Sequence, residues 1–294
     1  MKKLLLVLAL ILMAFSGCVE EKPRAEELKT MMIEASNEVD TMRFSLDMDQ
    51  VITIDGLNES QEIQKTTIKS NNVGEGLVNV TDKSIWVHIT TSMINPEYPE
   101  DNFTMEVENY LIEDTMYMKL DQNWTKIAGI PEDMWDEQNQ LKNQMAMFEH
   151  TDVELVGSEK INNQDTYKLE MVIDMDAFSA MMAEQLGSMP LFGLNLTEIY
   201  KDSEMDYVVW ISKETHLPLK ADMKMEISMT PEAMGLPAEL AGFNKMNTGM
   251  NMTTLYFDYN LPVKIELPEE AKDASSMPSV FEMMDPASST ATTV

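Results

Sequence analysis

The sequence is poor in cysteine, in histidine and in positive charge, and each shortage excludes a class of protein. Its 294 residues hold one Cys and three His, so it offers neither a disulfide framework nor a Cys/His zinc site. The histidines, His88, His150 and His216, share no metal-binding spacing. Lys and Arg number 21 against 51 Asp and Glu, which leaves a formal net charge of −30. Such a chain repels nucleic acid and anionic lipid headgroups.

Sequence motifs of enzymes are also missing. The chain has no G-x-S-x-G elbow, no Walker loop and no dinucleotide-binding fingerprint. The segments "DMDQ" and "DMDA" lack the D-x-D-x-D-G pattern of a calcium loop. The many carboxylates are spread along the chain, and we interpret them as a solvated face. The sequence therefore predicts no catalytic residue, no metal, no cofactor and no enzymatic activity.

The apolar run over residues 4–15 is too short to cross a bilayer, which takes about 20 helical residues. It follows Lys2 and Lys3 and precedes the small residues Ser16 and Gly17. A basic start, a short apolar run and small residues are the order of a secretory signal. The sequence therefore predicts a signal peptide over residues 1–17 and an exported protein.

The only cysteine directly follows this signal. The tetrad "FSGC" resembles a lipobox, with Phe15 where Leu is preferred. The resemblance implies cleavage before Cys18 and a diacylglycerol on its sulfur, and two acyl chains suffice for stable anchoring. We expect residues 18–24 to form a lipidated tether on the outer face of the cytoplasmic membrane or the cell envelope. The alternative is an ordinary cleaved signal or an uncleaved anchor, with an incidental cysteine.

The chain also carries six N-x-[S/T] sequons, a second mark of export. They are candidate glycosylation sites at Asn58, Asn79, Asn102, Asn123, Asn195 and Asn251. Together with the lipobox and the acidity they favour an archaeal envelope protein. The alternative is coincidence in a chain rich in Asn and Thr.

Hydrophobic periodicity predicts one domain over residues 25–271. Residues 25–39 have helical spacing, through Leu28, Met31, Met32, Ala35 and Val39, whereas most of the domain alternates with the period of strands. Strands are predicted over 42–55, 60–70, 73–80, 84–93, within 103–130, and over 153–161, 165–173, 203–212, 217–229 and 251–260. Further helices are predicted over 131–149 and 175–187, with helical turns in a lid-like loop over 231–246. Residues 272–294 are rich in Ser, Thr and Pro and predict a disordered tail.

These elements predict an α+β fold with one strongly curved antiparallel sheet. About ten sequential strands at roughly 4.8 Å spacing make a sheet some 48 Å wide. Three helices of about 10 Å diameter cover roughly 30 Å of it. The sheet must therefore curl around its three or four short helices, or the 231–246 segment or an apolar ligand must cover the rest.

The order of these segments is similar to that of the LolA/LppX-type lipoproteins and their uncharacterised relatives. The similarity runs over roughly residues 25–270 and includes the hairpin "WISKETHLPLK" at residues 210–220. It implies a half-barrel wrapped around helices with an apolar cavity between them. Members of this group bind acyl chains of lipoproteins or lipids, or have no known role, and no ligand residue can be transferred by motif.

Methionine is unusually frequent, at 29 residues. Its flexible, polarizable side chain suits a cavity that accepts varied apolar shapes. We predict a lining made of Phe44, Leu46, Met105, Val107, Met116, Met118, Leu169, Met171, Phe178, Met181, Met182, Met205, Tyr207, Leu219, Met223 and Met225. The alternatives are an ordinary core and a copper(I) site at Met116 and Met118 or at Met223 and Met225, because thioethers are soft ligands.

Two functional hypotheses remain. The first is a lipoprotein, held to the membrane by its anchor, that binds a lipid or other apolar ligand in the half-barrel cavity. The second is a non-catalytic structural or interaction protein of the cell envelope with no ligand.

Overall fold

The computed structural model describes residues 23–57, 63–130, 145, 148, 151–186, 195–201, 203–237 and 241–276. The predicted signal peptide, Cys18 and most of the predicted tail lie outside this part. None of the helices in the described ranges combines the length and apolar character that a membrane crossing needs.

Strands make up most of the described chain. The helices are α2 (Ala25–Asn37), α5 (Met175–Leu186), α6 (Leu196–Tyr200) and α8 (Glu269–Lys272), with a 3-10 turn at Pro99–Asp101. The strands are β1 (Thr41–Leu57), β2 (Ile63–Asn79), β3 (Ser84–Ile94), β4 (Phe103–Ile112), β5 (Thr115–Leu120), β6 (Asn123–Ala128), β7 (Asp152–Ile161), β8 (Gln164–Val172), β9 (Glu204–Ser212), β10 (Pro218–Met229), β11 (Phe243–Phe257) and β12 (Ser275–Ser276).

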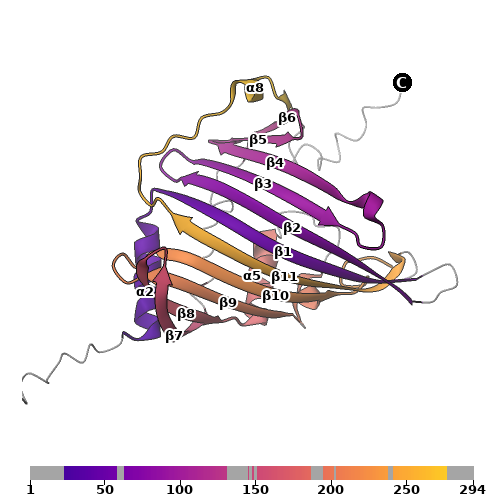
Figure 1. Cartoon of the computed structure of the whole chain (residues 1–294), viewed down its shortest axis with the longest axis horizontal. Helices are drawn as coiled ribbons and strands as arrows, with labels where there is room; N and C mark the ends of the chain where they lie inside the picture. The colour runs from indigo at the N-terminus through magenta and orange to yellow at the C-terminus, as the bar shows by residue number, and fades with distance from the viewer. Residues whose placement is uncertain are drawn as a thin grey trace, which may run out of the picture.

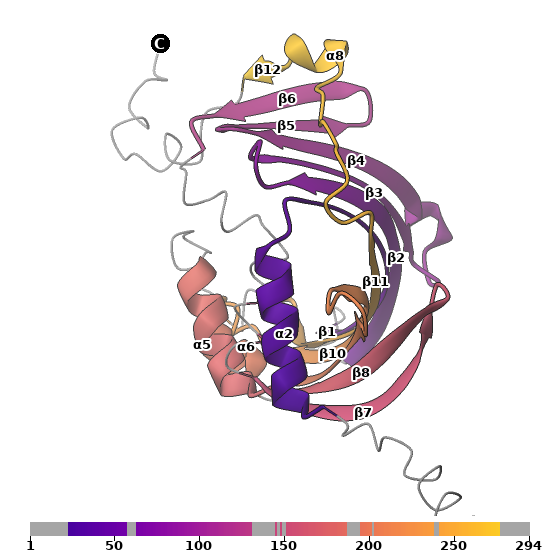
Figure 2. The same ribbon diagram turned by 90° about the vertical axis from the view of Figure 1, so that its left-hand side faces the viewer.

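These strands form one open, curved sheet in the order β12-β6-β5-β4-β3-β2-β1-β11-β10-β9-β8-β7. Two meanders, β1 to β6 and β7 to β11, meet where β1 pairs with β11 (Figure 1). The sheet wraps around α2, α5 and α6, which lie on its concave side (Figure 2). The described residues correct the prediction of about ten antiparallel strands: they form twelve strands, and the sheet is mixed because β12 pairs in parallel with β6.

The prediction of two separate strands over 60–70 and 73–80 is also wrong. The polar segment 60–70 and the apolar segment 73–80 belong to one strand, which pairs with β1 from Ile63 to Asn79. The change in composition reflects burial: Ile63, Gln64 and Lys65 are exposed, whereas residues 76–79 are buried. The composition changes from polar to apolar where the strand passes from the surface into the core, although the backbone continues as one strand.

The structure also corrects the predicted bounds of one loop and of the C-terminal tail. The lid-like loop predicted over 231–246 ends earlier, because β11 begins at Phe243 and pairs with Gly56 of β1. Residues 272–276, assigned to the tail, include the end of α8 and the strand β12. The helix predicted over 131–149 lies mostly outside the described residues, although Met145 and Phe148 are helical and buried.

The core lies between α2 and the concave side of the sheet. Leu28 and Met32 of α2 pack in one cluster with Met42 and Phe44 of β1. The N-terminus of α2 is capped by Glu27. Its carboxylate accepts a hydrogen bond from the Arg24 amide and lies 2.7 Å from the Arg24 guanidinium. Met31, predicted to share the buried face, is 39% exposed.

Gly76 of β2 is required by a close approach of a ring. A Cβ atom on Gly76 would lie 2.3 Å from Cζ of Phe44, the residue directly opposite on β1. Both residues lie in the middle of the sheet, so the ring has little room to move. The glycine thus lets Phe44 lie flat across the neighbouring strand.

We predict that Gly76→Ala lowers the free energy of unfolding by about 1–3 kcal/mol, as overpacking does in well-packed cores. Urea unfolding followed by tryptophan fluorescence measures it. Gly249→Ala on β11 is the matched control, because a Cβ there meets nothing within 4 Å. Equal effects of the two substitutions would contradict the steric explanation.

Candidate functional site

The candidate site is the side of the sheet that carries Phe44 and Leu46, called here the inner face. One row of directly opposed residues crosses it through Leu46, Thr254, Ala221, Val209 and Leu169. Residues opposed across an antiparallel pair point to the same side. The row therefore continues one surface from β1 to β8, beneath the helices shown in Figure 2.

Methionines are concentrated in the next two rows of the inner face. Met48, Met252 and Met223 are directly opposed on β1, β11 and β10. In the row beyond, Met250, Met225 and Met205 are opposed on β11, β10 and β9. We call these six residues the methionine array. Opposed Cβ atoms lie about 4.5–5.5 Å apart, so the thioethers form a continuous apolar surface.

The array keeps part of its surface accessible. Met225 is only 4% exposed, but the other five members are half-buried. Side chains of a closed core are almost entirely removed from water, as Phe44 and Leu169 are here. The array therefore presents surface that the described residues do not fully cover, and Met223 and Met252 also border the pocket on the opposite face described below.

The predicted lining residues on strands all follow the alternation of the inner face. Those from β4 and β5 are half-buried, whereas Leu169, Met171, Tyr207 and Leu219 are buried. Phe178 lies on α5, half-buried, with its ring edge-on to Tyr200 of α6 at 5.3 Å between centroids. Met181 and Met182 are also in α5, and their side chains lie outside the described part. The lining itself stays a prediction.

Met48, Met250 and Met252 were missing from the predicted lining. The signal was present, because Met246, Met250 and Met252 alternate with outward residues. Assigning 231–246 to a loop and starting the last strand at 251 hid Met246 and Met250, whereas Met48 and Met252 lay on predicted strands and were left out of the lining.

Polar side chains interrupt the inner face on β2 and β3. Ser70 Oγ donates to Gln50 Oε1 at 3.3 Å, and Thr91 Oγ1 donates to Asn72 Oδ1 at 2.7 Å. Gln50 is opposed to Met250, and Asn72 to Met48. The apolar array therefore has a polar border with satisfied hydrogen bonds, an arrangement that can orient an amphiphilic ligand.

Tyr207 lies beside the array with its hydroxyl in the core. Its ring packs edge-on against Phe148, with centroids 5.3 Å apart. Burial raises the pKa of Tyr207 well above its usual value, and interaction with Tyr256 adds to this. Burial likewise raises the pKa of Tyr259, whose hydroxyl donates to the Pro218 carbonyl at 2.6 Å. Both tyrosines are neutral at physiological pH and act as structural groups.

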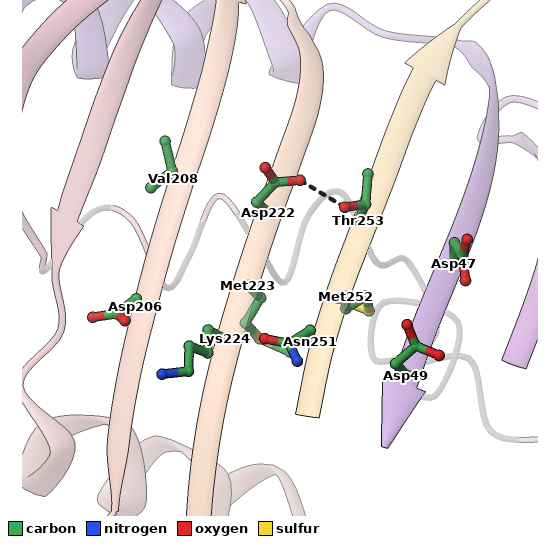
Figure 3. A pocket seen from close by; sticks show the side chains of 10 residues that line it. All are labelled: Asp47, Asp49, Asp206, Val208, Asp222, Met223, Lys224, Asn251, Met252 and Thr253. Carbon is green, nitrogen blue, oxygen red and sulfur yellow. Dashed lines mark hydrogen bonds between the residues drawn. The ribbon is translucent and has the colours of Figure 1, made fainter. Parts of the chain in front are cut away.

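The opposite face of the sheet carries an acidic pocket of about 410 Å³. Figure 3 shows it over β1 and β9 to β11, where Asp222 accepts a hydrogen bond from Thr253 at 2.7 Å. Asp47 and Asp49 share the Asn71 amide as donor, at 3.0 and 3.1 Å. Within the described residues no group of three or more His, Cys, Asp or Glu side chains is placed to hold a metal ion.

The hairpin "WISKETHLPLK" forms the end of β9, the turn and the start of β10. Trp210 lies between two ammonium groups, with Lys168 at 5.0 Å and Lys220 at 4.4 Å from its ring centroid. Its indole N–H donates to Glu159. The residues of this segment thus hold strands β7 to β10 together from the outside, a structural reason for the pattern.

The sequons differ in exposure. Asn102, Asn123, Asn195 and Asn251 are exposed, and Asn58 lies outside the described residues. Asn79 is only 4% exposed, and its amide donates to Asp82 at 3.0 Å and to the Val263 carbonyl at 2.9 Å. A glycan on Asn79 would require these contacts to open. Glycosylation at every site stays a prediction.

The model of a family described as "Family of unknown function (DUF6612)" matches residues 24–276. No curated protein matches the chain. Solved structures similar to it include the lipoprotein LppX of Mycobacterium tuberculosis, at 13% identity and a TM-score of 0.39, covering 82% of this chain and 99% of LppX. LprF of Mycobacterium bovis is similar at 11% identity and a TM-score of 0.40, covering 83% and 98%. A LolA superfamily protein of Nitrosomonas europaea is similar at 10% identity and a TM-score of 0.22, covering 84% and 96%.

LppX and the LolA superfamily protein carry the names of the group that the sequence resembles. Identities below 25% and TM-scores below 0.5 transfer no ligand or partner to this chain. The archaeal origin stays a prediction.

We predict that the free energy of unfolding falls as pH rises above about 10. The unfolded chain then releases tyrosine protons that Tyr207 and Tyr259 retain when folded, at up to about 1.4 kcal/mol per pH unit for each group. Urea unfolding at pH 9 and pH 11 measures the slope, which Tyr207→Phe should make shallower. An unchanged slope in that variant would show that Tyr207 ionises within the fold.

Proposed function

The chain belongs to the DUF6612 family, whose function is unknown, and we propose that it is an extracytoplasmic, membrane-anchored lipoprotein that binds a lipid or other apolar ligand on its inner face. The observation that carries this proposal is the methionine array. Its six residues lie on the concave side of the sheet, and five of them are half-buried.

An apolar ligand that covers the array would remove that surface from water, at roughly 25 cal/mol for each Å² buried. Methionine suits this role because its unbranched side chain adapts to ligands of different shape. The polar border at Gln50 and Asn72 can hold the hydrated end of an amphiphile. The protein would therefore bind by burial and orientation, without a chemical step.

The anchor part of the proposal rests on the sequence. A net charge of −30 opposes adhesion to an anionic membrane, so stable attachment needs the diacylglycerol on Cys18. The competing proposal, a ligand-free structural protein of the envelope, remains the second candidate, because a half-buried array can also be covered by a protein partner.

We predict that the protein purified from its own membrane carries lipid that denaturation releases, detected by native mass spectrometry. Met252→Lys places a charge in the array and should lower the co-purified lipid at least fivefold. Val51→Lys on β1, which is 41% exposed on the other face of the sheet, is the matched control and should retain the lipid. Wild-type protein that is consistently empty would favour the structural candidate.

We also predict that Cys18→Ser abolishes attachment through the anchor. Membranes washed with carbonate should retain the wild-type protein, whereas the variant should appear in the soluble or unprocessed fraction on immunoblots. Mature protein that remains membrane-bound without Cys18 would remove the anchor from the proposal. Ligand binding on the inner face would survive that result, because it depends on the array alone.

A further inference from the structure

A second pocket lies at the start of α2, apart from the methionine array. It has a volume of about 910 Å³, near the upper end of the range of ligand pockets. Its lining comes from Pro23 and α2, from the β-bulge between Leu155 and Gly157 of β7, from β8, and from the β9–β10 turn. We call it the anchor-side pocket; α2 and β7 lie side by side in both ribbon views (Figures 1 and 2).

The lining of the anchor-side pocket combines apolar and polar side chains. Met31 and Val156, which are 39% and 44% exposed, and the half-buried Leu155 give it accessible apolar surface, whereas Leu28 is buried. Ser158, Lys213 and His216 are its polar members. An exposed apolar surface next to polar groups is the arrangement that an amphiphile needs.

The charge of this pocket is opposite to that of the chain. Acidic residues outnumber basic ones 51 to 21, yet none of the described residues that line the anchor-side pocket is a carboxylate, whereas four aspartates line the pocket on the opposite face of the sheet. The Lys213 ammonium lies 4.7 Å from the centroid of the Tyr167 ring. The Lys213 ammonium thus gives the described lining a positive charge, which favours an anion despite the acidity of the rest of the chain.

The tether places this pocket near the membrane. Pro23, which lines it, follows Cys18 by five residues. Five extended residues span at most about 18 Å. A lipid of the bilayer to which Cys18 is anchored is thus the anionic amphiphile within closest reach.

We propose that the anchor-side pocket binds an anionic phospholipid of the anchoring membrane. Its phosphate lies at Lys213 and His216, and one of its chains lies along Met31, Leu155 and Val156. This contact would hold α2 at the membrane surface and orient the inner face with respect to the bilayer. The inference rests on the proposed anchor for the source of the lipid, and on the pocket alone for its chemistry.

Native mass spectrometry of the full-length, detergent-purified protein tests the site. The probes are dioctanoyl phosphatidylglycerol, dioctanoyl phosphatidylcholine, octanoate and inorganic phosphate. We expect phosphatidylglycerol to bind at least tenfold more tightly than any other probe. Equal binding of the two phospholipids, or equally tight binding of phosphate alone, would overturn the inference, because head charge and chain are both required.

Three variants assign the binding to this pocket. Lys213→Glu should weaken phosphatidylglycerol binding at least tenfold, and Val156→Asp should weaken it by removing the chain contact. Lys201→Glu is the matched control, because Lys201 is an exposed lysine at the end of α6 that does not line the pocket. The affinity of this variant for phosphatidylglycerol should stay within twofold of wild type. Unchanged binding in Lys213→Glu would overturn the inference.

Met252→Lys separates this inference from the proposed function. It should reduce lipid that co-purifies on the inner face and leave phosphatidylglycerol binding at the anchor-side pocket intact. Loss of phosphatidylglycerol binding in Met252→Lys but not in Lys213→Glu would place the lipid on the inner face. That result would overturn the second site and leave the proposed function standing.

Discussion

The pairing of β1 on both of its edges is the constraint on which the rest of the structure depends. β1 joins β2 over 17 residues on one side and β11 on the other, so two meanders from opposite ends of the domain become one sheet. Each strand of such a sheet twists against its neighbour, and the twist accumulates into curvature. The register between β1 and β11 is continuous from Arg43 to Asp55, and for this reason methionines from β1, β9, β10 and β11 form one array.

The sequence predicted the strands that have one wet face. Along β10 Met223 and Met225 alternate with Asp222 and Lys224, and the structure places the two methionines on the inner face. The sequence did not predict elements that are stabilised by strands distant along the chain. β12 has two residues and no pattern, and β11 begins inside a segment rich in Gly and Pro because β1 and β10 supply its hydrogen bonds.

The sequence predicted which residues of one strand share a face of the candidate site, but not which strands lie next to one another in it. Alternation can tell that Met223 and Met225 share a face, but only register tells that Met252 and Met48 extend their row. The anchor-side pocket had no sequence signal, since Pro23, Val156 and His216 come from three separate segments. Surfaces built by long-range pairing stay hidden from local periodicity for this reason.

The sheet is open, so it has two edges at which a strand has a neighbour on one side only. At one end the short strand β12 covers β6. At the other, β7 carries a bulge at Leu155 and Gly157, and exposed charges at Asp152, Glu154 and Lys160. Short, irregular or charged margins prevent strands of two molecules from adding to one another. A curved sheet that never closes into a full cylinder is thereby protected at both margins against strand-to-strand association between copies.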